Sequence, residues 1–172
     1  YKPMEMVGGD FYDFIEFREN HEIGIFIGDV TGHGVASALI TSMIKSIIHE
    51  SSYLKWNPAD LLLHLNNSLL NKTGGKFITA FYCIYNHKTK NLKYANAGHY
   101  PPYIITRNKI SKVPIIASLP LAVYSSEEVA YKNMELKLPD VSKLLIYTDG
   151  LIDAPQKDND SVLFKTQMDD KI

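Results

Sequence analysis

Two short apolar runs along the chain stop at an acidic residue. Residues 22–29 read EIGIFIGD and residues 144–150 read LLIYTDG. Runs of this length that are rich in β-branched and aromatic residues are typical of buried strands. A buried strand needs no carboxylate, but an acid at the end of the run can emerge into a cleft while the strand fixes its position. We therefore expect Asp29 and Asp149 to end two strands and to share one site.

Two other segments show the apolar spacing of helices. Between residues 35 and 48, apolar residues recur at helical spacing, which predicts a largely buried helix. A second helix is expected over residues 58–72, because Asn57 can cap it and Pro58 suits the first helical position. Its apolar face is formed by Leu61, Leu62, Leu65 and Leu69.

The middle of the chain is predicted to be β. Residues 77–85 and 92–96 are expected to form a hairpin, and a second pair of strands is expected near residues 103 and 110. The strand pattern continues over residues 129–138 with one interruption. Because strands and helices come in separate blocks, the predicted class is α+β with mainly antiparallel sheets rather than alternating βαβ units.

Composition narrows the class of protein. With 172 residues, 45% of them hydrophobic, the chain is long enough for one domain over residues 1–172. A net charge of −1 gives no basic field for a nucleic acid, and no run approaches the roughly 20 apolar residues of a membrane span. The single cysteine, Cys83, lies in an apolar run and fits a reducing, cytoplasmic compartment.

Glycine accompanies each of three acids. Asp10 follows two glycines, Asp29 follows one, and Asp149 precedes one. A glycine lets the backbone turn sharply and approach a ligand closely. Each acid alone could be ordinary turn chemistry. Together the three favour a site for Mg²⁺ or Mn²⁺, which prefer oxygen ligands, and the sequence has no Cys or His cluster suited to structural zinc.

Several residues beside these acids have two interpretations. Asp13 can support the first acid or face solvent. His33 can contact a phosphate, donate a hydrogen bond to a residue that binds the metal, or face water. Gly32 and Gly34, at the start of a helix, can offer N–H groups to an anion. His99 can line the cleft, although a simple junction between a strand and a turn is the preferred interpretation.

Four ordered motifs give the chain a resemblance to a known family. They are VGGDFYD at 7–13, GDVTGHG at 28–34, NAGH at 96–99 and YTDG at 147–150. In this order they resemble the PPM-type (protein phosphatase 2C-like) serine/threonine phosphatases, in the bacterial branch typified by SpoIIE and RsbU. The resemblance implies a four-layer αββα sandwich of two mainly antiparallel sheets flanked by helices, with a two-metal centre at one edge.

The resemblance also implies a role for single residues. The acid matching Asp29 bridges two Mn²⁺ or Mg²⁺ ions, the carbonyl matching Val30 ligates one ion, and the acids matching Asp10 and Asp149 complete opposite sides. A water that the metals acidify then attacks phosphorus directly. The implied substrates are phosphoserine or phosphothreonine proteins, typically anti-anti-sigma factors, and a sensor or receiver domain often precedes such a domain.

Departures from the family pattern leave alternatives open. Similar proteins carry a further strand with a final metal-binding aspartate, whereas the acidic pair at residues 169–170 has no apolar strand after it. We therefore read the chain as a fragment that lacks its first strand region and its C-terminal strand. Ala122 stands where a glycine is usual, which is expected to alter a local turn.

The alternative function is a catalytically weak or inactive phosphatase-like module that binds a regulatory partner, which the missing acid would explain. A diguanylate cyclase is suggested by GGDF at residues 8–11, but in that family the signature lies in mid-domain rather than at the start. A metal-free structural domain would leave the repeated pattern of acids unexplained.

Overall fold

A computed structural model of the protein describes residues 8–17 and 21–152. The described residues fall into two compact units, one drawn from residues 8–99 and 115–137 and the other from residues 100–114 and 138–152. Each unit has its own sheet, and all strands paired within these sheets are antiparallel. The predicted α+β class with antiparallel sheets is confirmed. The prediction of one domain over residues 1–172 stays a prediction.

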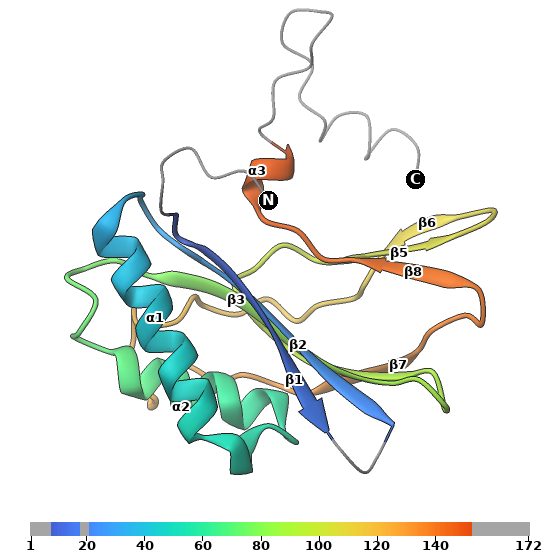
Figure 1. The fold of residues 1–172 in the computed structure, drawn as a ribbon, viewed down its shortest axis with the longest axis horizontal. Coiled ribbons are helices and arrows are strands. Elements are labelled where there is room, and N and C mark those ends of the chain that lie inside the picture. The colour runs from blue at the N-terminus through green and yellow to red at the C-terminus, as the bar shows by residue number, and fades with distance from the viewer. Residues whose placement is uncertain (1–7, 18–20, 153–172) are drawn as a thin grey trace, which may run out of the picture. The chain divides into compact units, whose positions relative to one another are not determined.

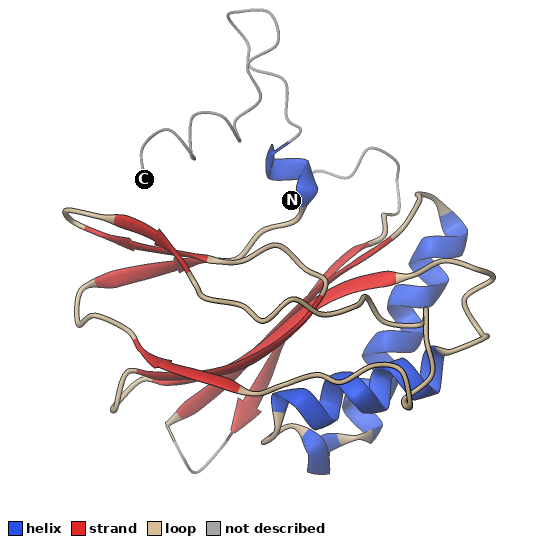
Figure 2. Ribbon diagram, turned by 180° about the vertical axis from the view of Figure 1, so that it is seen from behind, coloured by secondary structure: helices blue, strands red, loops and turns tan. Residues whose placement is uncertain are grey.

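The first unit is built on a five-stranded sheet. Its strands are ordered β1-β2-β3-β4-β7. Figure 1 shows the fold from one side and Figure 2 shows it from behind, with the strands in red. The strands are β1 (Asp10–Phe17), β2 (Glu22–Val30), β3 (Ile78–Asn86), β4 (Asn91–Ala97) and β7 (Met134–Lys137). The hairpin predicted over residues 77–96 is therefore confirmed as β3 and β4.

Helices α1 (Val35–Glu50) and α2 (Pro58–Leu69), joined through the short helix η1 (Ser52–Leu54), cover one face of this sheet (Figure 1). Alternate strand residues such as Phe26, Ile78 and Tyr82 belong to the same buried core as residues of the helices. Side chains alternate between the two faces along a strand. The face opposite the helices therefore carries the residues between them, which include Asp29.

Both predicted helices are present, but the end of α2 and the burial of two residues of α1 differ from the prediction. α2 begins at Pro58, and the Asn57 side chain accepts a hydrogen bond from the Asp60 backbone N–H. It ends at Leu69 rather than near residue 72, because Leu70 turns to an extended ψ of 132°. In α1, Val35 and Leu39 are 68% and 62% exposed although the pattern predicted burial, since the sheet covers only one side of the helix.

The second unit contains a three-stranded sheet in the order β6-β5-β8. Its elements are β5 (Tyr103–Thr106), β6 (Ile110–Lys112), β8 (Ser142–Leu145) and the one-turn helix α3 (Asp149–Ile152). Tyr103, Tyr147 and Ile152 form its small core, in which the two tyrosine rings stack with centroids 5.6 Å apart. The strands expected near residues 103 and 110 are confirmed.

Three strand predictions need correction. β1 was not predicted, although its residues alternate between exposed and half-buried positions. The pattern over residues 129–138 yields a strand only at β7, because Val129 and Tyr131 are buried without strand pairing. The strand expected over 144–150 ends at Leu145. Leu145 pairs with Tyr103 of β5. Residues 101–102, which precede Tyr103, are prolines and have no N–H to donate, so the pairing of β5 with β8 stops there.

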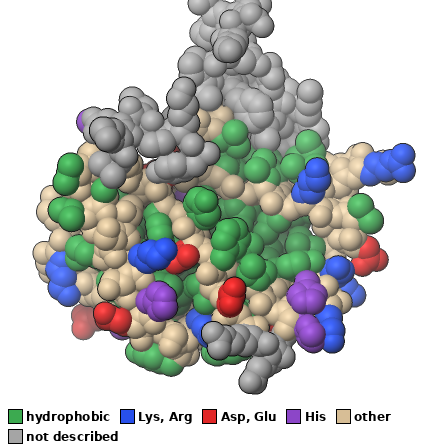
Figure 3. All heavy atoms as spheres, viewed as in Figure 1, with side chains coloured by type: hydrophobic (Ala, Val, Ile, Leu, Met, Phe, Trp, Pro, Cys, Tyr) green, Lys and Arg blue, Asp and Glu red, His purple; other side chains and the backbone are tan. Residues whose placement is uncertain are grey.

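The surface carries charges of both signs. Figure 3 shows the Lys and Arg side chains of the described residues interspersed with Asp and Glu on the face in view. No helix in the described part of the chain is both long and apolar enough to cross a membrane.

Candidate metal centre

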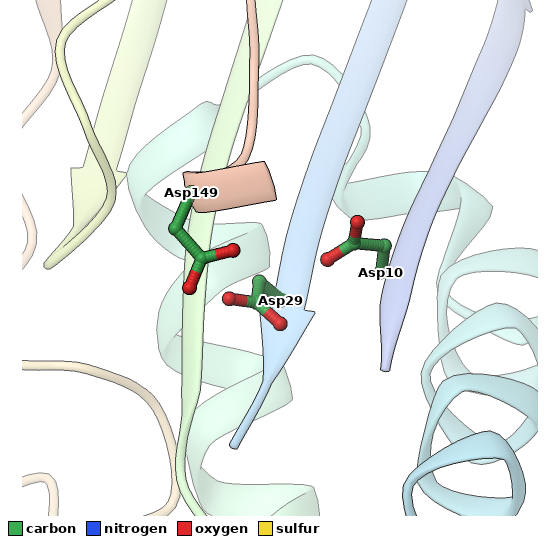
Figure 4. Close-up of side chains that lie close together, drawn as sticks. All are labelled: Asp10, Asp29 and Asp149. Carbon is green, nitrogen blue, oxygen red and sulfur yellow. The ribbon is translucent and has the colours of Figure 1, made fainter. Parts of the chain in front are cut away.

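Asp10 and Asp29 lie directly opposite each other in the first unit. They are register partners at one end of the β1–β2 pair, and both are half-buried. Directly opposite residues of an antiparallel pair share one face of the sheet. This is the face away from the helices, and we call it the acid face. One carboxylate oxygen of Asp10 lies within 4.8 Å of one of Asp29 (Figure 4).

The facing acids suit a hard divalent cation. Two like charges directly opposite each other in a sheet are destabilising, and a cation bound by both would remove that repulsion. Carboxylate oxygens are the ligands that Mg²⁺ and Mn²⁺ prefer. The residues therefore fit the metal that the sequence predicted, while their role as ligands stays a prediction.

Gly9 allows the two strands to meet closely at this corner. The Val30 backbone N–H donates to the Gly9 carbonyl at 3.2 Å. A Cβ at residue 9 would lie only 2.4 Å from the Val30 carbonyl oxygen, a backbone atom that cannot move aside alone. Glycine is therefore required here. The Val30 carbonyl, which the resemblance assigns to metal binding, lies beside Gly9.

The turn after Asp29 is tied to the start of β3. The Thr31 N–H donates to the Phe77 carbonyl at 3.0 Å, and the Phe77 N–H donates to Thr31 Oγ1 at 3.1 Å. Lys76 Nζ donates to the Thr31 carbonyl at 2.9 Å. Gly32 and Gly34 both have left-handed φ values, 81° and 82°. These conformations favour glycine and leave His33 exposed between them.

Asp13 does not support Asp10. It pairs with Phe26 in the register, so it lies on the helix face of the sheet. Its carboxylate is 3.7 Å from Lys45 Nζ of α1. Of the two interpretations that the sequence left open, support of the first acid is wrong, because three residues along a strand reverse the face.

Asp149 is the first residue of α3 in the second unit, and its side chain is exposed. The sequence predicted it at a strand end, but three residues separate it from the end of β8. Figure 4 shows its side chain at the start of α3. The acidic pair at residues 169–170 lies outside the described residues.

Sequence reasoning undervalued two residues next to the facing acids. Thr79 of β3 is the register partner of Asp29 on its other side. His99 is only 3% exposed, and its Nδ1 lies 2.8 Å from Thr79 Oγ1 in a hydrogen bond. The junction predicted at residues 96–99 exists, because β4 ends at Ala97, but it holds a buried histidine. The NAGH motif at residues 96–99 was the sequence feature that could have indicated a role for His99.

The family match covers most of the chain. The family model for stage II sporulation protein E (SpoIIE) matches residues 19–169. The chain belongs to the SpoIIE family. The phosphoserine phosphatase RsbU of Bacillus subtilis (strain 168) is 30% identical over 153 residues, which are 88% of this chain and 45% of RsbU. The phosphoserine phosphatase RsbP of the same organism is 27% identical over 158 residues, 89% of this chain and 38% of RsbP. The SpoIIE-family chain thus spans less than half the length of these two relatives.

Solved structures agree with the family assignment at the level of the fold. The RsbU and RsbW domains of a Mycobacterium tuberculosis protein match with a TM-score of 0.79 and 22% identity, over 98% of this chain and 45% of that one. The PP2C phosphatase domain of SpoIIE from Bacillus subtilis, with a fragment of its regulatory domain, matches with a TM-score of 0.74 and 17% identity, over 91% and 45%. RsbX in complex with magnesium matches with a TM-score of 0.67 and 19% identity, over 86% and 69%. The SpoIIE-family chain therefore has the fold of protein phosphatase 2C domains.

Proposed function

We propose that this SpoIIE-family chain is a metal-dependent phosphatase domain that hydrolyses phosphoserine or phosphothreonine on a regulatory protein. The observation that carries the proposal is the facing pair of Asp10 and Asp29 at the end of β1 and β2. The names of RsbU and RsbP as phosphoserine phosphatases support the reaction. The solved complex of RsbX with magnesium supports the choice of metal.

The proposed ligands of two Mg²⁺ or Mn²⁺ ions are the carboxylates of Asp10, Asp29 and Asp149 and the carbonyl of Val30. Asp29 is the central ligand in this proposal, because it faces Asp10 in the sheet and is followed directly by Val30. Asp149 is proposed as the ligand from the second unit. The bound ions would activate a water and neutralise charge on the phosphoryl oxygens.

The turn between Asp29 and α1 is proposed to receive the phosphate. Gly34 is the N-cap of this 16-residue helix, so the N–H groups of its first turn lack partners within the helix. Such groups, together with the positive end of the helix dipole, favour an anion. Gly32 and Gly34 let the backbone approach a phosphate, and exposed His33 between them is a proposed contact.

The proposed substrate is a phosphorylated protein of the anti-anti-sigma-factor type. This choice depends on the resemblance to the SpoIIE and RsbU branch. A protein partner suits the mixed charges on the face in Figure 3 better than a nucleic acid does. A sensor or receiver domain in the complete protein and a cytoplasmic location belong to the same proposal.

Replacing Asp29 tests the proposed function. We expect Asp29→Ala to lower Mn²⁺-dependent turnover of p-nitrophenyl phosphate by about 10³-fold, the rate equivalent of several kcal/mol of transition-state stabilisation. The thermal melt should change little, because the substitution also removes repulsion from Asp10. Asp13→Ala is the matched control, since Asp13 lies on the same strand pair but on the helix face, and it should keep wild-type turnover.

Two outcomes would contradict this assignment. Normal turnover by Asp29→Ala would exclude Asp29 from the reaction, and a collapsed melt would make it a structural residue. If the wild-type chain binds Mn²⁺ but does not turn over the substrate, the weak or inactive regulatory module is the better function.

A further inference from the structure

We propose that Thr79 and His99 position the Asp29 carboxylate for metal binding, with His99 acting through the Thr79 hydroxyl. The inference rests on the proposed function, which makes Asp29 the central ligand. It adds two residues that do not themselves bind the metal. Both belong to the first unit, as Asp29 does.

The β-sheet register places Thr79 beside Asp29. Asp10, Asp29 and Thr79 are successive cross-strand partners on β1, β2 and β3, so they form one row on the acid face. The Cβ atoms of such direct partners are about 4.5–5.5 Å apart, which brings a threonine hydroxyl within reach of a carboxylate. Asp29 therefore has a like charge on one side and a hydrogen-bonding hydroxyl on the other.

The hydrogen bond between His99 and Thr79 limits what the Thr79 hydroxyl can do. His99 Nδ1 and Thr79 Oγ1 are 2.8 Å apart. A hydroxyl has a single hydrogen but two acceptor positions. In the proposed arrangement the Nδ1–H group donates to Thr79 Oγ1, so that the hydroxyl hydrogen is directed at the Asp29 carboxylate. Such a hydrogen bond would fix the orientation of the carboxylate toward the proposed cation.

The backbone around His99 is built to hold the ring in place. Gly98 has a φ of 68°, and a Cβ there would lie 2.9 Å from the Pro120 ring. Ser118 Oγ donates to the Asn96 carbonyl and accepts from the Gly98 N–H at 3.3 Å. His99 is buried with this support, so its ring has little freedom to leave Thr79.

Replacing Thr79 with valine tests the hydroxyl while keeping the shape of the side chain. Partners that orient a metal ligand are typically worth 10- to 100-fold in affinity. We therefore expect Thr79→Val to weaken Mn²⁺ binding by about 10-fold in calorimetry. Thr79→Ser, which keeps the hydroxyl, should stay within about 2-fold of wild type, well below that range.

Tyr82→Phe is the matched control. Tyr82 lies on the same strand but on the helix face, and its buried hydroxyl donates to the Lys55 carbonyl at 2.7 Å. This variant should lower the melting temperature without changing Mn²⁺ affinity. Equal affinity of Thr79→Val and wild type, or equal weakening in Tyr82→Phe, would overturn the proposal.

A double-mutant cycle tests whether His99 acts through Thr79. His99→Gln removes the Nδ1 group, and it should weaken Mn²⁺ binding to the same extent as Thr79→Val. The double variant should be no weaker than either single variant, because the two changes break one chain of interactions. Additive losses of affinity would show that His99 does not act through Thr79, and would overturn the proposed role of His99.

A measurement without metal separates this proposal from the proposed function. The ¹³C resonance of the Asp29 carboxyl in the metal-free protein should move in Thr79→Val and His99→Gln and stay unchanged in Tyr82→Phe. If wild type fails to bind Mn²⁺ but the resonance responds in this way, the proposed function fails and the positioning role stands. An unchanged resonance in all three variants would overturn the positioning role.

Discussion

Ala122 holds a backbone conformation that its side chain disfavours. Its φ is 66°, in the left-handed region, and its N–H donates to Asn66 Oδ1 at 2.9 Å. The neighbouring Leu121 exchanges two hydrogen bonds with Ile78, which prevents the turn from relaxing. The left-handed region costs a residue with a Cβ roughly 1–2 kcal/mol. The position at which the family resemblance implies glycine thus has a positive φ in this chain.

Ala122→Gly should therefore stabilise the protein. We expect the free energy of unfolding to rise by about 1 kcal/mol, because the left-handed conformation carries no penalty for glycine. Urea denaturation of both proteins gives the difference. Ala95→Gly in β4 is the control, and it should destabilise because a buried strand residue loses its side chain. A destabilised Ala122→Gly would show that the turn does not store this strain.

At the scale of elements, the β3–β4 hairpin buries groups that normally titrate at alkaline pH. Burial raises the pKa of the Cys83 thiol from 9.0 to about 12. Burial also raises the pKa values of Tyr82 and Tyr94 above the ordinary 10.0. The folded protein therefore keeps these protons at pH values where the unfolded chain has released them.

This difference predicts a loss of stability in alkali. Between about pH 9 and pH 12 the unfolded state binds fewer protons than the native state, so the free energy of unfolding falls as pH rises. The stability from these groups is fully present below pH 9. Thermal melts at a series of pH values should show the decline, and Tyr82→Phe should make it shallower above pH 10.

Tyr53→Phe is the control for the alkaline series. Tyr53 is 70% exposed, so this variant removes a tyrosine hydroxyl without removing a buried group. A melting temperature that stays constant between pH 8 and pH 11 would contradict the prediction.

At the scale of the whole molecule, the proposed ligands come from both compact units. Asp10 and Asp29 belong to the first unit, and Asp149 belongs to the second. A ligand that binds only the native state stabilises the parts that hold it. Under the proposed function, metal binding should therefore stabilise those segments of each unit that carry a ligand.

Amide hydrogen exchange can detect this stabilisation in each unit. Mn²⁺ should slow exchange in β1 and β2 of the first unit and also in β5 and β8 of the second. In Asp149→Asn the protection should remain in the first unit and disappear from the second. Asp140→Asn, at an exposed acid before β8, is the control and should behave as wild type. Unchanged protection of β5 and β8 in Asp149→Asn would exclude Asp149 as a ligand.

Local sequence patterns were sufficient to predict those elements whose structure depends on residues close together in the chain. Helix α2 begins where Asn57 and Pro58 predict it, because capping and the proline φ act within one turn. The hairpin of β3 and β4 follows from two apolar runs around a polar turn. Asp10 and Asp29 were selected by their glycines and by the apolar run, and the sheet brings those two together.

Tertiary structure decided what depends on residues far apart. The row of Asp10, Asp29 and Thr79 comes from strand register, and Thr79 is 50 positions from Asp29. The exposure of Val35 follows from the single sheet face that α1 covers. His99 is buried against Thr79, 20 positions away, and the residues just before it, Asn96 and Gly98, contact Ser118 and Pro120. A residue's own neighbours in sequence set its backbone preferences, whereas register and burial arise only when distant segments pack, so no local pattern could predict them.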